Sequence, residues 1–205
     1  MSTVLSVPAA PVAPEVRASR ARVPLRRPSG WFGRLMNAAG GWMYGQPMDT
    51  ATAMSGNRAM LLSWGVFELG VARWRALDPQ LKLLAELAVA VRIECGWCLD
   101  FGYFEGHRRG VDLAKLRAVP QWRTATLFTP LERLVLEYAE AATATPPEVT
   151  DDMTESLRAE LGDAAVVELT MMVAVENLRS RFNAALGLQS QGFAEACRVP
   201  GEASP

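Results

Sequence analysis

The chain has 205 residues, half of them apolar, and its formal net charge of −1 results from 21 basic and 22 acidic side chains. A chain of this length can bury a sizeable core without disulfide staples, and its near-neutral charge gives no electrostatic attraction to nucleic acid or to an acidic membrane surface. We therefore expect one globular domain with tails, and neither nucleic acid nor a membrane as a partner.

The first 30 residues are rich in proline, alanine and arginine, a composition typical of a disordered arm. They lack the uninterrupted apolar segment that a secretory signal requires. The longest apolar stretch of the chain, residues 164–175, is interrupted by Glu168 and is too short to span a bilayer. Three cysteines without a secretory signal favour the reducing cytoplasm, where a CxxC pair is more often catalytic than structural.

The spacing of apolar residues from 31 to 193 predicts a single domain that is helical almost throughout, followed by a flexible tail over 194–205. The expected helices cover about residues 31–43 (interrupted at Gly40 and Gly41), 57–77, 79 to the CxxC pair, that pair to 109, 112–119, 129–143, 151–161 and 164–186. No segment alternates polar and apolar residues for long enough to form a strand, so the predicted fold class is all-α.

The candidate functional feature is the motif CGWC at residues 95–98, whose two thiols are close enough to form and open a disulfide. If a helix begins at or near Cys95, its unpaired N–H groups and its dipole would stabilise a thiolate, the reactive form of a thiol. Cys197 and the single histidine, His107, form no second paired motif, so we expect no zinc site. Two inert cysteines that only pack in the core are the alternative interpretation.

Phosphate-binding loops, metalloprotease motifs and nucleophile elbows are not found in the sequence, so no cofactor is expected. Several separated segments carry a family pattern instead: CGWCLDFG at 95–102, LFT at 127–129, ERLVLEYAE at 132–140, VELT at 167–170 and ENLRSRFNAALG at 176–187. With these segments the chain resembles the carboxymuconolactone decarboxylase and alkylhydroperoxidase D superfamily. The resemblance implies an alkylhydroperoxidase D-like helical bundle that forms homo-oligomers (dimer, trimer or hexamer).

The resemblance also implies a chemistry for the two cysteines. Cysteine-bearing members of the superfamily are peroxidases that reduce hydroperoxides through a reversible disulfide, which a dithiol donor reduces again. In that scheme Cys98 attacks the peroxide and becomes a sulfenic acid, and Cys95 then condenses with it to form the disulfide. The expected partners are therefore a small hydroperoxide and a dithiol reductant. Thioredoxin-type proteins expose the first cysteine of the pair instead, so the order of attack stays open.

Two residues of the superfamily's proton relay are missing from this chain. In alkylhydroperoxidase D a histidine follows the second cysteine by four residues and a glutamate precedes the first by twelve, and together they activate the thiol. These positions hold Gly102 and Leu83 here, so we expect weak peroxidase activity. Other acidic residues are candidates for proton transfer or for support of the cysteines: Glu86, Glu94, Asp100, Glu105 and Glu176.

Structural interpretations of these acidic residues remain open beside the functional ones. Asp100 suits the first turn of a helix because of the helix dipole, and Glu105 suits an exposed helical surface. Glu176, Arg179 and Asn183 share one stripe of the last helix. This stripe predicts a partly buried ion pair that fixes the helix against its neighbours. The alternative is that Glu176 or Arg181 lines a cavity beside the cysteines.

Two other functions are compatible with the sequence. The first is a decarboxylase or isomerase of small carboxylic acids on the same scaffold, in which arginine or glutamate side chains perform the chemistry. The second is a non-enzymatic, redox-sensing oligomeric protein, whose dithiol would titrate reversibly without turnover of peroxide.

Overall fold

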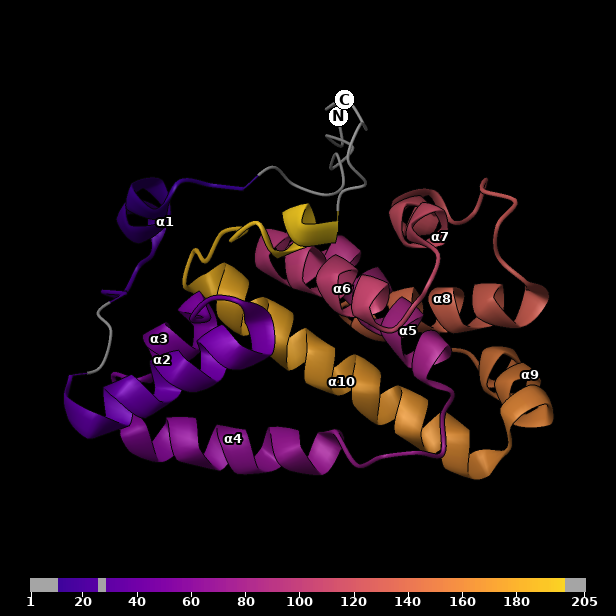
Figure 1. Cartoon of the computed structure of the whole chain (residues 1–205). Helices are drawn as coiled ribbons and strands as arrows, with labels where there is room; N and C mark the ends of the chain where they lie inside the picture. The colour runs from indigo at the N-terminus through magenta and orange to yellow at the C-terminus, as the bar shows by residue number, and fades with distance from the viewer. Residues whose placement is uncertain (1–10, 26–28, 198–205) are drawn as a thin grey trace.

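The computed structural model describes residues 11–25 and 29–197, which are helical and contain no strand (Figure 1). The helices are α1 (Pro14–Arg20), α2 (Gly30–Tyr44), α3 (Asp49–Met54), α4 (Arg58–Val71), α5 (Pro79–Ile93), α6 (Gly96–Arg108), α7 (Leu113–Ala118), α8 (Pro130–Thr143), α9 (Asp151–Leu161) and α10 (Asp163–Ala185). Two short 3-10 helices, η1 (Val119–Gln121) and η2 (Phe193–Cys197), complete the series. The predicted all-α fold class is confirmed.

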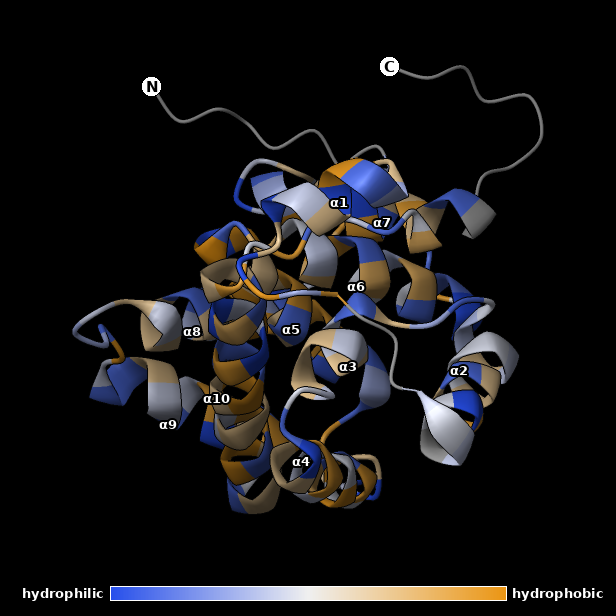
Figure 2. Ribbon diagram, turned by 90° about the vertical axis from the view of Figure 1, so that its left-hand side faces the viewer, coloured by the Kyte–Doolittle hydropathy of each residue, from blue (hydrophilic) through white to orange (hydrophobic). Residues whose placement is uncertain are grey.

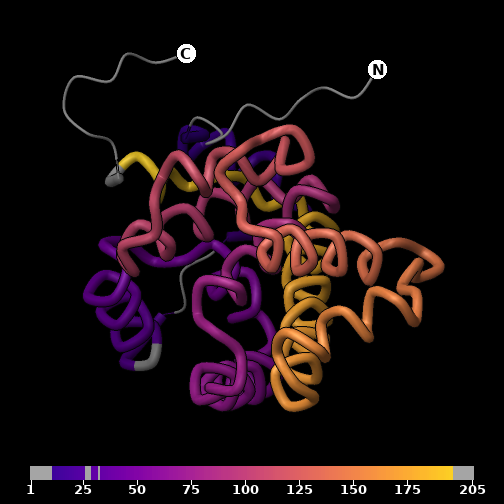
Figure 3. Tube along the Cα trace, turned by 90° about the vertical axis from the view of Figure 1, so that its right-hand side faces the viewer, coloured from indigo at the N-terminus to yellow at the C-terminus, as the bar shows by residue number. Residues whose placement is uncertain are grey.

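Helix α5 occupies the centre of the molecule, where it packs against α6, α8 and α10. Its buried residues lie all round the helix, which is the pattern of a helix surrounded by others. The long helix α10 crosses the molecule and packs against α5, α6, α8 and α9 (Figure 1). Figure 3 shows α8 and α9 beside α10 at the edge of the bundle. Within the described residues, none of the helices is both long and apolar enough to cross a membrane.

The helix starts follow from their capping residues. The side chain of Asp78 accepts hydrogen bonds from the first amides of α5, and Thr129 forms a capping box with Glu132 at the start of α8. Each of these helices has a proline in its first turn, where the missing N–H costs nothing. Because these signals are local, the predicted starts of both helices are confirmed.

Two predicted boundaries in the N-terminal half are wrong. Helix α2 continues through Gly40 and Gly41, and a Cβ added at Gly40 would lie 3.2 Å from the backbone of Pro47, so this glycine permits a close approach of two segments. Helix α4 ends at Val71, and the buried Leu77 lies in the loop that follows. Apolar side chains in that loop were mistaken for helix because tertiary contacts, not helical periodicity, bury them.

The described part of the predicted N-terminal arm contains α1 and contacts the C-terminal segment, which corrects the expectation of a disordered arm for residues 11–25. The amide of Arg22 donates to the carbonyl of Leu186, and the guanidinium of Arg17 pairs with Asp49. Gly187 adopts a φ of 69°, and a Cβ there would lie 2.6 Å from the carbonyl oxygen of Arg20. Figure 2 shows α1 on the same side of the molecule as α6 and α7. The remaining residues of the predicted arm, 1–10 and 26–28, lie outside the described ranges.

The domain also extends beyond its predicted end at residue 193. Phe193 and Ala194 are buried, and η2 packs against α6. The predicted tail over 194–205 therefore begins too early, and its residues 198–205 lie outside the described part of the chain.

Candidate active site

Cys95 and Cys98 lie at the start of α6 and are joined by a disulfide, with their Cα atoms 5.3 Å apart. Glu94, which ends α5, has a φ of 60°, and this left-handed residue turns the chain directly from α5 into the CGWC motif. Cys95 is the N-cap of α6, and its Sγ accepts a hydrogen bond from the amide of Cys98 at 3.3 Å. Both cysteines are buried, Cys95 with 2% and Cys98 with 8% of its surface exposed. Cys98 is thus the more accessible of the two.

A second hydrogen bond reaches the pair from α10. Nδ2 of Asn183 donates to Sγ of Cys98 at 3.3 Å, and Oδ1 of Asn183 accepts from the hydroxyl of Thr50 on α3 at 3.0 Å. Asn183 is buried, with 1% of its surface exposed, so its amide is satisfied inside the protein. Asn183 on α10 therefore connects Thr50 on α3 to the sulfur of Cys98 on α6.

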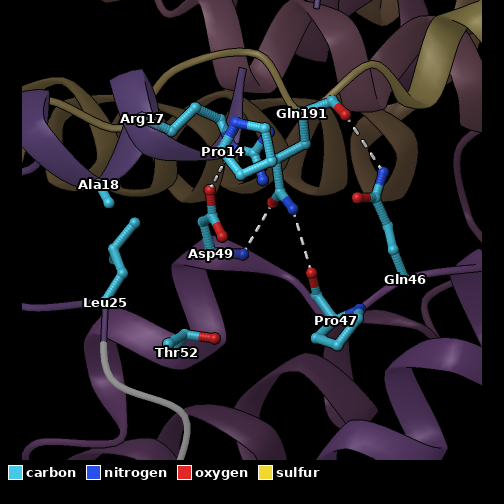
Figure 4. Close-up of a pocket in the computed structure, with 9 residues that line it drawn as sticks. All are labelled: Pro14, Arg17, Ala18, Leu25, Gln46, Pro47, Asp49, Thr52 and Gln191. Atoms are coloured by element: carbon cyan, nitrogen blue, oxygen red, sulfur yellow. Dashed lines mark hydrogen bonds and ion pairs between the residues drawn. The ribbon is translucent and has the colours of Figure 1, made fainter. Parts of the chain in front are cut away.

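Trp97, inside the CGWC motif, ties the cysteine turn to the segments around it. Its indole N–H donates to Oε1 of Gln191 at 2.8 Å. The same oxygen accepts from the amide of Asp49, and Nε2 of Gln191 donates to the carbonyl of Pro47 (Figure 4). The indole also stacks on Phe101, with ring centroids 5.2 Å apart. These contacts fix the conformation of the turn that carries both sulfurs.

A small cavity of about 280 Å³ lies between α1, α3 and Gln191 (Figure 4). It is lined by Pro14, Arg17, Ala18, Leu25, Gln46, Pro47, Asp49, Thr52 and Gln191. The ion pair between Arg17 and Asp49, at 2.8 Å, connects α1 to α3 across this cavity. Helix α3 therefore borders the cavity and also supplies Thr50 to the hydrogen bond network of Cys98.

Asp100 is fully buried and holds the C-terminal segment against α6. Its carboxylate accepts hydrogen bonds from the backbone amides of residues 191, 192, 193 and 194, at 2.8, 2.8, 3.1 and 2.8 Å. These four bonds compensate the cost of burying a carboxylate. We therefore assign Asp100 a structural role, which differs both from proton transfer and from the expected interaction with the helix dipole.

The predicted stripe on α10 contains an ion cluster centred on Arg179. Its guanidinium bonds to Glu68 of α4 at 2.9 Å, to Glu86 of α5 at 2.8 Å and to Glu176 at 3.4 Å. The interpretation of this stripe as an ion pair that fixes α10 against its neighbours agrees with these contacts. Asn183, the third member of the stripe, instead contacts Cys98.

Glu176 is the buried acid of this cluster. Its Oε1 accepts a hydrogen bond from the hydroxyl of Ser180 at 2.7 Å. Burial raises the pKa of Glu176 to about 8, although the charge of Arg179 acts in the opposite direction, and the nearby charge of Glu86 raises it further. Because Arg179 is already shared with two other carboxylates, Glu176 retains its proton at neutral pH.

The other candidate acids have contacts elsewhere or lie at the surface. The carboxylate of Glu105 bonds to Arg108 and Arg109, each at 3.2 Å. Glu94 is exposed, and its described role is the backbone turn between α5 and α6. His107 is exposed near the end of α6, as expected. The described contacts of Glu86 and of these residues do not include either sulfur.

The two positions that hold a proton relay in alkylhydroperoxidase D are part of a close apolar contact here. A Cβ added at Gly102 would lie 2.7 Å from Cδ2 of Leu87, so any side chain at this position requires Leu87 to move. Leu83 is buried in the core, with 2% of its surface exposed. The contact between α5 and α6 thus leaves no polar group at either position. Within the described residues, no cluster of histidine, cysteine and acidic side chains could hold a metal ion.

Three polar residues of the site were not identified from the sequence: Thr50, Ser180 and Gln191. Ser180 follows Glu176 by four residues and precedes Asn183 by three, and this polar stripe on an otherwise apolar helix was a usable signal. Gln191 contacts Trp97 of the motif, and Thr50 contacts Asn183, only through the tertiary fold, so the sequence carries no local signal for them.

Comparison with known proteins agrees with the resemblance. Residues 58–141 match the model of the carboxymuconolactone decarboxylase family. The uncharacterized protein YnjA of Escherichia coli (strain K12) is 40% identical over 124 residues, which cover 60% of this chain and 66% of YnjA. The matched segment therefore spans slightly less than two thirds of that relative.

Solved structures of similar fold include three proteins. An uncharacterized peroxidase-related protein from Silicibacter sp. TM1040 has a TM-score of 0.74 at 15% identity, over 88% of this chain and 94% of the other. The debrominase Bmp8 has a TM-score of 0.69 at 18% identity, over 80% and 88%. The protein ATU0492 from Agrobacterium tumefaciens is of unknown function, and its name links it to the antioxidant defence protein AhpD. It has a TM-score of 0.63 at 22% identity, over 67% of this chain and 94% of the other.

At these identities the structural likeness concerns the fold alone, and it confirms the alkylhydroperoxidase D-like helical bundle. The sequence match to the family model begins at the start of α4 and includes the cysteine pair. Residues 58–141 of the chain are thus similar to the carboxymuconolactone decarboxylase family.

Proposed function

We propose that the protein is a dithiol–disulfide oxidoreductase that reduces small hydroperoxides with Cys95 and Cys98. The observation that carries the proposal is the disulfide between two cysteines of one turn at the N-terminal end of α6. A pair in this position can open and close without a rearrangement of the helices that carry it. The polar donors around it, the amide of Cys98 and the side chain of Asn183, can hold a negatively charged sulfur.

The proposed reaction begins with the reduced pair. The thiolate of Cys98 attacks one oxygen of the hydroperoxide, the O–O bond breaks, and the alkoxide leaves as an alcohol after it takes up a proton. Cys98 is then a sulfenic acid, and the thiol of Cys95 displaces its hydroxyl group, which leaves as water. A dithiol donor reduces the resulting disulfide by exchange and supplies two electrons and two protons. One hydroperoxide and one dithiol thus give one alcohol, one water and one oxidised donor.

The exposure of the two cysteine residues supports Cys98 as the attacking thiol. Cys98 has 8% of its surface exposed and Cys95 only 2%, so a small peroxide meets Cys98 first. Cys95, whose sulfur accepts the amide of Cys98, is placed to resolve the sulfenic acid within the same turn.

Slow turnover is part of the proposal. The donors described at the two sulfurs are a backbone amide and an asparagine side chain, and neither group titrates. The relay positions hold Leu83 and Gly102, so the proton for the leaving alkoxide comes from solvent. We propose the cytoplasm as the setting, because its reducing thiols can regenerate the pair, and a homo-oligomer as the working form.

A steady-state peroxidase assay with an organic hydroperoxide and a dithiol donor tests the proposal. Cys98→Ser should abolish turnover, and Cys95→Ser should stop after one turnover with a sulfenic acid on Cys98. Cys197→Ser serves as the control and should retain the wild-type rate. Equal rates in wild type and Cys98→Ser would exclude a thiol peroxidase. A dithiol that titrates reversibly without any turnover would instead support a redox sensor.

A further inference from the structure

We propose that Asn183 is a catalytic residue that stabilises the thiolate of Cys98, and that Thr50 is the positioning residue that orients it. The inference rests on the proposed function, since it supplies the activation of Cys98 that the missing relay would otherwise give. It assigns this role to a side chain from α10, oriented by a side chain from α3, and not to a histidine on α6.

The orientation of the Asn183 amide follows from its two contacts. The hydroxyl of Thr50 donates to Oδ1 at 3.0 Å, which leaves Nδ2 to face Sγ of Cys98 at 3.3 Å. A sulfur in a disulfide or a thiolate carries no hydrogen and can only accept a hydrogen bond. Asn183 therefore presents its donor to the sulfur both before reduction and after it.

Burial makes this hydrogen bond effective. Asn183 has 1% and Cys98 8% of its surface exposed, so little water competes for either group. A hydrogen bond to the charged form of a group favours that form, and it is stronger in a low-dielectric interior than in water. The partial charge of the asparagine N–H thus replaces some of the solvation that the thiolate loses in the core.

The neutral amide of Asn183 is the donor described at Cys98 from another helix, and none of the contacts described for this sulfur involves a charged side chain. Glu94, next to Cys95, is exposed. Charged side chains with partners of their own are found on the surrounding elements: Asp49 on α3, Glu86 on α5, Asp100 on α6, Lys115 on α7, Arg179 on α10 and Glu195 on η2. Their hydrogen bonds and ion pairs change little when Asn183 is replaced, so a substitution there isolates the amide.

The test measures how fast iodoacetamide alkylates Cys98 as a function of pH. A background of Cys95→Ala and Cys197→Ser leaves Cys98 as the single thiol, because the chain has 3 cysteines. Asn183→Leu keeps the shape of the side chain but removes its donor, and should raise the midpoint of the alkylation profile by about one to two pH units. Thr50→Val should raise the midpoint by less, and Thr50→Ser should restore it.

Asn177→Leu is the matched control on the same helix. Nδ2 of Asn177 donates to the hydroxyl of Thr143 at 2.9 Å and to the carbonyl of Val173 at 3.0 Å, so its loss should leave the midpoint unchanged. The circular dichroism of each variant shows whether it is folded. If Asn183→Leu does not fold, Thr50→Val carries the test, because Thr50 does not itself touch the sulfur.

An unchanged midpoint in folded Asn183→Leu, or in folded Thr50→Val where the first variant does not fold, would overturn the inference. Alkylation involves no peroxide, so this result would leave the proposed peroxidase reaction standing. The reverse outcome would be a shifted alkylation midpoint in the variants together with no peroxidase activity in the wild type. The role of Asn183 in thiolate stabilisation would hold, and the proposed substrate class would fail.

Discussion

Glu176 is a buried acid whose pKa lies within the ordinary working range of pH. It is buried beside Arg179, which already bonds to Glu68 and Glu86. A third carboxylate at the same guanidinium would lack a full counter-charge in the core, and such a charge is costly. Burial therefore raises the pKa of Glu176 to about 8, from an ordinary value of 4.5.

This pKa predicts how stability depends on pH. Between about pH 4.5 and 8 the folded protein keeps the proton of Glu176 while the unfolded chain has lost it, so the free energy of unfolding falls as pH rises. Glu176→Gln mimics the protonated acid and lacks this dependence. The variant should gain about 1–3 kcal/mol relative to wild type between pH 5 and pH 8, measured by urea unfolding. Parallel pH profiles of the two proteins would contradict the prediction.

Prediction of the site from the sequence succeeded where the signal is local and failed where it is tertiary. The spacing of Cys95 and Cys98 was sufficient to predict that the two sulfurs come together at a helix start. The partner of Cys98 could not be predicted, because Asn183 is 85 residues away and meets it only when α10 packs against α6. The four amides that bind Asp100 belong to residues 191–194, and the predicted tail over 194–205 includes the last of them.

Among the elements, the contact between α5 and α6 sets the surroundings of the cysteine turn. Gly102 lets the two helices approach so closely that an added Cβ would lie 2.7 Å from Leu87. In the helical segments, the predicted bounds of α8 and α9 are correct to within a residue, since caps define them. Helix α3 is not predicted from the sequence because, unlike the equally short α7 with its N-cap Asp112, it has no side-chain N-cap.

Gly102→Ala should destabilise the protein by about 1–3 kcal/mol, because the new methyl group overpacks the α5–α6 contact. Leu87→Ala should relieve much of this cost in the double variant, so the two effects should be non-additive in a double-mutant cycle of urea unfolding. Gly41→Ala, at an exposed position of α2 with no atom within 4 Å of the added Cβ, is the control and should stabilise by up to about 1 kcal/mol. Additive effects of Gly102→Ala and Leu87→Ala would argue against the contact.

At the scale of the whole molecule, helix α4 exposes large apolar side chains on the surface. Of the residues in α4, Val71 is buried, while Leu62, Val66 and Leu69 have 56, 71 and 60% of their surface exposed. In Figure 1 this helix lies along the lower edge of the molecule, beyond α10. An exposed row of large apolar side chains is typical of a surface that another protein covers.

We expect this surface to pair copies of the chain. Wild type should have the mass of a homo-oligomer in light scattering at micromolar concentration, and Leu62→Glu with Val66→Glu should lower the mass toward that of one chain, because the charges cannot be buried unpaired. Glu137→Gln, at an exposed position of α8, is the control and should keep the wild-type mass. A wild type that is already monomeric would refute the expectation.

The four backbone amides that bind Asp100 belong to the C-terminal part of the chain, and this affects the order in which the protein can fold during its synthesis. Its four donors, residues 191–194, leave the ribosome only after all of the helices α1 to α10 have been synthesised. Until they arrive, the carboxylate of Asp100 has no protein donors and must stay in contact with water. Gln191, which holds the indole of Trp97, arrives in the same stretch. The nascent chain therefore carries an unfinished cysteine turn, and the two cysteines acquire their final surroundings at the last stage of synthesis.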